Sequence, residues 1–353
     1  MSPLLRLLRD ASRSDSFEPR EWAVALSHAR RTRMLPKLDT RLRADNRIAT
    51  APDTVREVLD GIRNYVDYIH RRLRYEVAQL ESLAADVDFP VVLLKGSAYI
   101  VTGAPCAPGR TVRDIDILVA REHLDTMENT LHAQGWGYKE DLTSYDESYY
   151  RTLSHELPPM RHPEFDFELD VHHSVIAPTH RYSVDMDAVL QEIVPVPGSA
   201  FFVLGEVDQI VHSATHLLTA EEVERGLRDL HDIQELAAAL AARQISADDI
   251  LSRARDVGLY EPVHQALTAC RTHFGPRYQE NATFLEDGDH RISRKLVAWS
   301  LRHLLFDERG APSYAKRLAA AYVWMRAQAM RMPWYSLLRH TYMKFSQRLK
   351  PEL

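Results

Sequence analysis

The run from Arg113 to Val119 constrains the fold more than any other part of this sequence. Polar and apolar residues alternate along it, a pattern that predicts a β-strand with successive side chains on opposite faces. Asp114 and Asp116 therefore share one face, while Ile115 and Ile117 lie on the other. Two carboxylates on one face repel each other unless a cation lies between them. Because Mg²⁺ takes one or two carboxylates and completes its shell with phosphates and water, this face is a candidate site for a metal–nucleotide complex.

The bulk composition favours an ordinary globular protein. The chain has 353 residues, of which 45% are hydrophobic and 27% charged, enough for two or three domains with a sizeable core. The net charge of −6 gives no general argument for nucleic-acid binding. Cys106 and Cys270 fit neither a disulfide framework nor a zinc spacing, and no signal peptide or apolar run of transmembrane length is present. We therefore expect a cytoplasmic location.

Changes in periodicity divide the chain into three regions. Residues 1–86 have helical spacing, with a long helix expected over 64–83. Residues 87–205 contain strand candidates at 89–94, 113–119 and 165–172, with helices between them. Residues 206–353 read as helical again, most clearly at 207–218, 220–240, 247–257 and from 294 onward. The expected class is α+β, with a small mixed-sheet α/β core between an N-terminal helical region and a C-terminal helical domain.

Two further elements bear on chemistry. Gly96-Ser97 follows a predicted strand and precedes a short helical segment, where free backbone N–H groups and the Ser97 hydroxyl could bind phosphate. The same dipeptide could equally be a plain strand-to-helix turn. Downstream, a strand carries Asp166, Glu168 and Asp170 on one face, and one of them could supply the third carboxylate of a two-metal phosphoryl-transfer site. Periodicity does not choose among the three, and a solvated acidic face is the alternative.

The order strand, Gly-Ser, helix, Asp-x-Asp and a later acid resembles the polymerase-β-like nucleotidyltransferase superfamily. The chain looks most like a branch of uncharacterised bacterial nucleotidyltransferases with a Leu-Lys-Gly, Arg, Asp-Ile-Asp-Leu-Leu-Val and Asp-Leu-His signature. The matching residues are Leu94-Lys95-Gly96, Arg110, Asp114 to Val119, and Asp170-Val171-His172. The similarity is sharp over these motifs and extends more loosely to the helices on both sides.

This resemblance implies specific roles. Asp114, Asp116 and Asp170 would hold Mg²⁺ or Mn²⁺ and carry catalysis. The triphosphate would be bound by a second group of residues: Lys95, Gly96, Ser97, Arg110 and Arg113. Arg110 could instead hold the loop that leads to the Asp pair. The family often has a basic helix ending in Asp, which Arg228 and Asp232 match as possible substrate residues together with His172; an ordinary ion-paired helix face is the alternative.

The implied activity is transfer of a nucleoside monophosphate from an NTP to a hydroxyl-type acceptor, with release of pyrophosphate. The acceptor could be a small molecule, a sugar, a protein or an RNA end. One alternative is a nucleotide-binding or regulatory module on the same fold without turnover. Another is an RNA-directed transferase that uses the basic segment 311–353, which contains eight Lys or Arg residues and only one acidic residue, Glu352. That segment could also pack against the acidic remainder of the chain.

The other His and Cys residues that could carry chemistry are explained better by structural roles than by metal binding or catalysis. His212 and His216 have the i, i+4 spacing of a helical zinc pair but lack the Glu that follows the first His in such motifs. They could be packed or could border a substrate cleft. His172 and His173 lack, in the sequence, the third ligand that zinc needs. Cys106 has no evident His partner that would make it a nucleophile.

Overall fold

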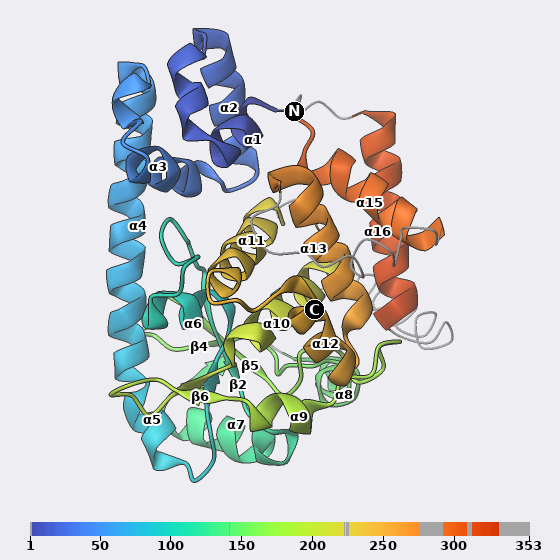
Figure 1. Ribbon diagram of the computed structural model, residues 1–353. Coiled ribbons are helices and arrows are strands. Elements are labelled where there is room, and N and C mark those ends of the chain that lie inside the picture. The colour runs from blue at the N-terminus through green and yellow to red at the C-terminus, as the bar shows by residue number, and fades with distance from the viewer. Residues whose placement is uncertain are drawn as a thin grey trace, which may run out of the picture.

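In the computed structural model the Asp114 region forms the middle strand of a mixed sheet, surrounded by helices (Figure 1). The structure describes residues 2–140, 142–221, 223, 226–275, 292–308 and 313–331, without the side chains of 144, 145 and 147. The strands are β1 (Val92–Leu93), β2 (Asp114–Leu118), β3 (Gly137–Tyr138), β4 (Met160–Arg161), β5 (Glu168–His172), β6 (Val194–Pro195) and β7 (Phe202–Val203). Within the described residues these seven strands pair in the order β3-β4-β5-β2-β1-β7-β6.

The centre of the sheet is where the sequence pattern is clearest. β2 pairs in parallel with β5 and antiparallel with β1, and β1 pairs in parallel with β7, so the sheet is mixed as predicted. Ile115 and Ile117 are almost completely buried, as expected for the apolar face of β2. The predicted strands at 89–94 and 165–172 are present as the shorter β1 and β5. β3, β4, β6 and β7 were not expected, because two-residue strands carry no readable period.

The N-terminal region is helical, as predicted. Its helices are α1 (Pro3–Arg9), α2 (Pro19–Arg31), α3 (Leu35–Ala44), α4 (Asp53–Gln79) and α5 (Glu81–Asp86), with 3₁₀ turns η1 (Ala11–Ser16) and η2 (Ile48–Thr50). The long helix begins earlier than expected and ends at Gln79 instead of Leu83. Buried residues at helical spacing, including Val55, Leu59 and Val66, explain why α4 continues through Gly61. α4 runs along one side of the molecule and contacts α3 and α6 (Figure 1).

Shorter helices connect the strands. They are α6 (Lys95–Thr102), α7 (Leu124–Ala133), α8 (Ser144–Thr152) and α9 (Met186–Gln191), with the 3₁₀ turn η3 (Arg121–His123) before α7. α6 begins directly after β1, packs against β2, and ends at Gly103, whose φ of 66° is the left-handed conformation common at helix ends. The strand–turn–helix unit predicted around Gly96 is therefore present.

The C-terminal part is again helical, as predicted. Its described helices are α10 (Glu206–Thr219), α11 (Leu227–Ala241), α12 (Ala247–Asp256), α13 (Tyr260–Phe274), α15 (Ile292–Leu305) and α16 (Tyr314–Arg331). α10 is buried along most of its length and contacts α11, α12 and α13. α11 begins at Leu227, later than the expected residue 220. The capping box of Ser246 and Asp249 fixes the start of α12 at the predicted place.

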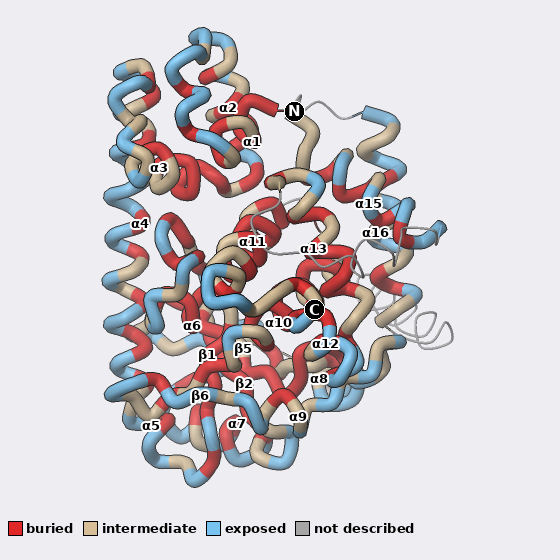
Figure 2. The backbone as a smooth tube through the Cα atoms, in the orientation of Figure 1, coloured by how far each residue is buried: buried red, intermediate tan, exposed pale blue. Residues whose placement is uncertain are grey.

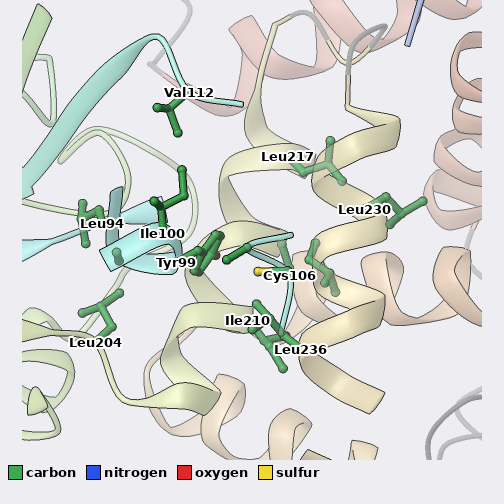
Figure 3. Close-up of a cluster of buried hydrophobic side chains, with 14 of the residues drawn as sticks. Leu94, Tyr99, Ile100, Cys106, Val112, Leu204, Ile210, Leu217, Leu230 and Leu236 are labelled. Atoms are coloured by element: carbon green, nitrogen blue, oxygen red, sulfur yellow. The ribbon is translucent and has the colours of Figure 1, made fainter. Parts of the chain in front are cut away.

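One hydrophobic core joins the sheet to the C-terminal helices. Buried segments gather in the sheet and along α10, α11 and α13, whereas much of α4 is exposed (Figure 2). In Figure 3, Tyr99 and Ile100 of α6 and Cys106 of the following loop lie against side chains of α10 and α11. This shared core fixes the loop after α6 between the sheet and the helices. The proposed boundaries at 86/87 and 205/206 stay a prediction.

Candidate functional site

The register of β2 and β5 brings the predicted carboxylates together. Asp116 is paired with Asp170 across the two parallel strands, and Asp114 precedes Asp116 by two residues on the same face. All three line one cavity of about 290 Å³. The other acids of β5 and its approach point elsewhere: Glu168 pairs with Lys139 and Arg161, and Asp166 pairs with Arg72. Of the three acids that periodicity left open, Asp170 is the one that lines the cavity together with Asp114 and Asp116.

Asp116 is the most constrained of the three carboxylates. Its side chain is buried, and its Oδ1 lies 3.0 Å from Lys95 Nζ and 2.9 Å from His172 Nε2. Burial alone would raise the pKa of Asp116, but the Lys95 ammonium and the His172 hydrogen bond hold that pKa well below its usual range. Asp116 is thus an ionised carboxylate in a buried site.

The two remaining carboxylates are destabilised as anions. Burial, together with the charge of Asp116, raises the pKa of Asp114, and burial with the charges of Asp116 and Glu156 raises the pKa of Asp170 to about 7. Ionisation of all three carboxylates would therefore place more negative charge on this part of the cavity wall than Lys95 compensates. Carboxylate oxygens with such an excess of charge suit a hard divalent cation.

The three carboxylates are spaced more widely than the ligand atoms of a compact metal site. Two groups among the described residues have metal-ligand atoms that all lie within 4.8 Å of one another. The triad of Asp114, Asp116 and Asp170 is not one of them. The donor chemistry fits Mg²⁺ or Mn²⁺, and binding would require the carboxylates to close around the ion.

The turn after β1 places Lys95 and Gly96 at the cavity. Lys95 adopts a φ of 44°, a left-handed conformation that costs a residue with a Cβ about 1–3 kcal/mol and is commonest at functional sites. Both residues line the cavity. A Cβ on Gly96 would lie only 2.3 Å from Val112 Cγ1, so only glycine fits beneath the loop.

Ser97 lies behind this turn. Its hydroxyl is fully buried, donates to the Leu94 carbonyl at 3.2 Å and accepts from the backbone N–H of Asp116 at 3.3 Å. Ser97 thereby ties the start of α6 to β2, next to the metal-ligand candidates. Its predicted contact with phosphate stays a prediction.

Arg110 holds the loop before β2. Its buried guanidinium pairs with Asp232 and, at 2.6 Å, with Asp229 of α11. Its backbone carbonyl accepts a hydrogen bond from His70 of α4 at 2.7 Å. Burial opposes the charge, but the two carboxylates raise the pKa of Arg110 further above its usual value. Of the two roles predicted for Arg110, these contacts favour fixing the loop.

Several other cations surround the carboxylates. The basic residues lining the cavity are Arg33, Lys95, Arg110, Arg113 and Arg228. Arg113 is exposed, whereas Arg228 donates to the Thr111 carbonyl at 3.0 Å and lies beside Asp229. The predicted pair Arg228 and Asp232 therefore reaches the cavity wall. An anionic ligand such as a triphosphate would meet positive charge on this side of the cavity.

Sequence reasoning missed Glu156, which also lines the cavity. The segment 154–157 runs antiparallel to the end of β5, where Glu156 bridges to His172 and the Leu157 N–H donates to the Val171 carbonyl at 2.8 Å. This irregular segment has no periodicity that would have indicated a strand-like partner. His172, predicted as a possible substrate residue, is buried between Asp116 and Glu156.

The remaining candidates lie at or behind the cavity. His216 lines it, and the charge of Lys95 together with burial lowers the pKa of His216 to about 3. His212 and Cys106 are buried, and burial raises the pKa of the Cys106 thiol well above its usual value. His173 points away and contacts Arg121.

Only part of the basic C-terminal segment lies in the described residues. Within α16, Arg326 donates to the Leu218 carbonyl at 2.7 Å, and Arg331 pairs with Glu221 at 2.8 Å. These two residues pack against the body of the molecule. Residues 309–312 and 332–353 lie outside the described part. Among the helices that the structure describes, none has the length and apolar character required to cross a membrane.

Comparison with known proteins agrees with this geometry. Searches of curated proteins and of solved structures returned no significant match. Residues 18–275, which include every candidate site residue described above, match a family described as uncharacterised nucleotidyltransferases. The match covers well over half of the chain, and it includes the sheet, α6 and the helices α10 to α13. The chain therefore belongs to this nucleotidyltransferase family.

Proposed function

We propose that the chain transfers a nucleoside monophosphate from an NTP to a hydroxyl-type acceptor and releases pyrophosphate. One observation carries the proposal: Asp116 and Asp170 are paired in register on neighbouring parallel strands, with Asp114 on the same face, and all three line one cavity. Family membership supports the reaction class. The acceptor would be a small molecule, a sugar, a protein or an RNA end.

In this proposal Asp114, Asp116 and Asp170 hold Mg²⁺ or Mn²⁺. The ion would neutralise the triphosphate and make the acceptor hydroxyl a better nucleophile. His172 donates to Asp116 at 2.9 Å and thereby fixes the orientation of that ligand. Lys95 neutralises Asp116 at 3.0 Å, and its ammonium would bind a phosphate oxygen of the NTP.

The triphosphate would lie over the turn after β1. Lys95 and Gly96 line the cavity there, and Ser97 holds the turn against β2. Arg113 is an exposed cation on the cavity wall and is free to follow a bound phosphate. Arg228 and Asp232, which also line the cavity, would contact the acceptor or the base.

The test is a screen of labelled NTPs with Mg²⁺ or Mn²⁺ against metabolite and lysate panels, followed by mass spectrometry of the product. The double variant Asp114→Asn/Asp116→Asn should abolish pyrophosphate release, because amides do not supply the charge that the ion needs. Glu168→Gln is the matched control, since Glu168 lies on the neighbouring strand but pairs with Lys139 at the surface. Activity retained in the double variant would refute the metal-site assignment.

A non-catalytic role gives a different result in the same experiments. Calorimetric titration of the wild-type chain with Mg²⁺ and each NTP would then show binding without pyrophosphate release under any acceptor condition. If the chain neither binds an NTP nor releases pyrophosphate, the fold has a scaffold role only. Transfer that depends on Asp114 and Asp116 excludes both outcomes.

A further inference from the structure

Beside the predicted carboxylate triad, His155, Glu156 and His172 form a second group of possible metal ligands. His172 Nδ1 lies 3.4 Å from Glu156 Oε2, and His155 Nε2 lies 3.7 Å from the same oxygen. One ligand atom from each residue lies within 4.8 Å of the other two. The sequence offered His172 no third ligand, but the chain path of residues 154–157 along β5 supplies two.

The hydrogen bonding of His172 leaves one ring nitrogen without a partner. Its Nε2 lies 2.9 Å from Oδ1 of Asp116, a carboxylate that can only accept when ionised, so Nε2 carries a proton. In a neutral imidazole Nδ1 then presents a lone pair toward Glu156 Oε2, another acceptor. Nδ1 is buried without a hydrogen-bond partner in a side chain that is only 3% exposed. Two acceptors facing each other in a buried site require a positive species between them.

In another cluster of the protein, a lysine ammonium lies directly between the ligand atoms. The cluster of His231, Asp232 and Glu235 has similar ligand spacing, and Lys37 Nζ lies 2.9 Å from Asp232 and 2.7 Å from Glu235. An ammonium therefore occupies that cluster. Among the described residues, no Lys or Arg lies within salt-bridge distance of Glu156, whose ion-pair partners are His155 and His172; the nearby Lys95 ammonium pairs with Asp116 instead.

We propose that His155 Nε2, Glu156 Oε2 and His172 Nδ1 bind a divalent transition-metal ion of the zinc class. Ligands about 2.0–2.2 Å from a tetrahedral ion lie about 3.3 Å apart, close to the observed 3.4 and 3.7 Å. Two imidazoles and one carboxylate are ligands that Zn²⁺ and its neighbours prefer, whereas Mg²⁺ prefers oxygen alone.

The surroundings of His172 match those of a metal-binding histidine. Such a histidine usually donates its other ring N–H to a carboxylate, as His172 does to Asp116. The new site would thus share one hydrogen bond with the predicted Mg²⁺ site while using different ligands. Glu156 also lines the cavity, so the ion would lie at the cavity wall. This inference does not depend on nucleotide transfer.

Metal binding can be measured directly on the full chain. Zn²⁺ and Co²⁺ are titrated separately into metal-free protein by calorimetry, in excess Mg²⁺ so that the Asp carboxylates are saturated with their preferred ion. We expect one equivalent of either metal to bind, and the Co²⁺ protein to gain visible absorption bands typical of nitrogen ligands in a four-coordinate site. Absence of stoichiometric binding would overturn the proposal and leave a proton on His172 Nδ1 as the positive species.

Ligand variants distinguish this site from adventitious binding. His155→Ala and the nearly isosteric Glu156→Gln should each weaken Co²⁺ binding by at least about 100-fold, because even an outer residue of a metal site contributes about 10–100-fold. His162→Gln serves as the histidine control, since His162 lies outside the cluster beside Trp136. Binding unchanged in folded Glu156→Gln protein would contradict the proposal. Asp114→Asn should retain Co²⁺ binding while losing transfer, which separates failure of this site from failure of the proposed function.

Discussion

At the scale of single residues, Gly96 is a position at the cavity that leaves no room for a side chain. It lies in the first turn of α6, at the cavity, and the side chain of Val112 occupies the space where a Cβ would project. Val112 belongs to the loop that leads into β2 and is itself nearly buried. A side chain at position 96 must therefore displace the loop that carries Arg110 and Arg113.

Gly96→Ala should lower the free energy of unfolding by about 1–3 kcal/mol, the usual cost of overpacking, and weaken NTP binding. The clash is with Val112 Cγ1 at 2.3 Å, whereas Val112 Cβ lies at an ordinary 3.5 Å. Val112→Ala should therefore relieve this clash. The free energy of unfolding of the double variant should then be higher, by about 0.5–3 kcal/mol, than the value obtained by adding the effects of the two single variants. Denaturant unfolding of the four proteins completes the cycle. Strict additivity would show that Val112 does not restrict position 96.

At the scale of elements, buried ion pairs connect three segments that are distant in sequence. Lys37 of α3 and Arg110 of the loop before β2 both pair with Asp232 of α11. Asp232 is almost completely buried, so its charge requires these partners. The pairs hold the loop between the sheet and the C-terminal helices, beside the carboxylates.

Arg110→Ala should destabilise the fold by about 3 kcal/mol, the lower end for a broken buried pair, because Lys37 still neutralises Asp232. Arg113→Ala is the matched control, since Arg113 is exposed on the cavity wall three residues later. It should leave the free energy of unfolding within about 0.5 kcal/mol of wild type and raise KM for the NTP. Denaturant unfolding and steady-state kinetics separate the two effects. Equal stability of both variants would contradict the structural role of Arg110.

At the scale of the whole molecule, half-buried histidines lie where the C-terminal helices join the body. His273 of α13 stacks on Phe306 just after α15, with ring centroids 3.6 Å apart. His180 accepts from the Tyr182 N–H at 3.0 Å, and the adjacent Arg181 N–H donates to the Met330 carbonyl of α16 at 2.8 Å. Both rings are packed as neutral groups between segments far apart in the chain.

These histidines predict acid lability. Burial, reinforced by nearby arginines, lowers the pKa of both His180 and His273 to about 4 from the ordinary 6.5. The unfolded chain therefore binds more protons than the folded one between these values, so their contribution is complete above pH 6.5 and is lost as the pH falls toward 4. Each group should lower the free energy of unfolding by up to about 1.4 kcal/mol per pH unit in that window.

Denaturant unfolding from pH 7.5 to 4.5 measures this loss, and His180→Gln should flatten the profile. Because desolvation is the largest cause of both shifts, the slope should persist at about 1 M NaCl, where exposed charges are screened. A flat profile, or a slope abolished by salt, would show that burial of these rings does not control acid stability.

Prediction from sequence succeeded where a pattern is local and repeats. The alternation at Asp114 to Ile117 gave the strand and its faces, and helical spacing gave both helical flanks. The edge strands β3 and β6 were not predicted, because a strand of two residues is too short to show an alternating pattern. Helical spacing was recognised from Asp53 onward, but not that one helix, α4, continues through Gly61 into the segment from Asn64.

The sequence by itself determined that Asp114 and Asp116 share one strand face, because side-chain direction along a strand depends only on neighbouring residues. Only the tertiary structure decided that Asp170 joins them, that Arg110 pairs with Asp232, and that His155 and Glu156 lie beside His172. Those contacts link segments that can be more than a hundred residues apart, and they depend on strand register and helix packing. No local sequence pattern predicts strand register or helix packing, since both result from burial of the whole core.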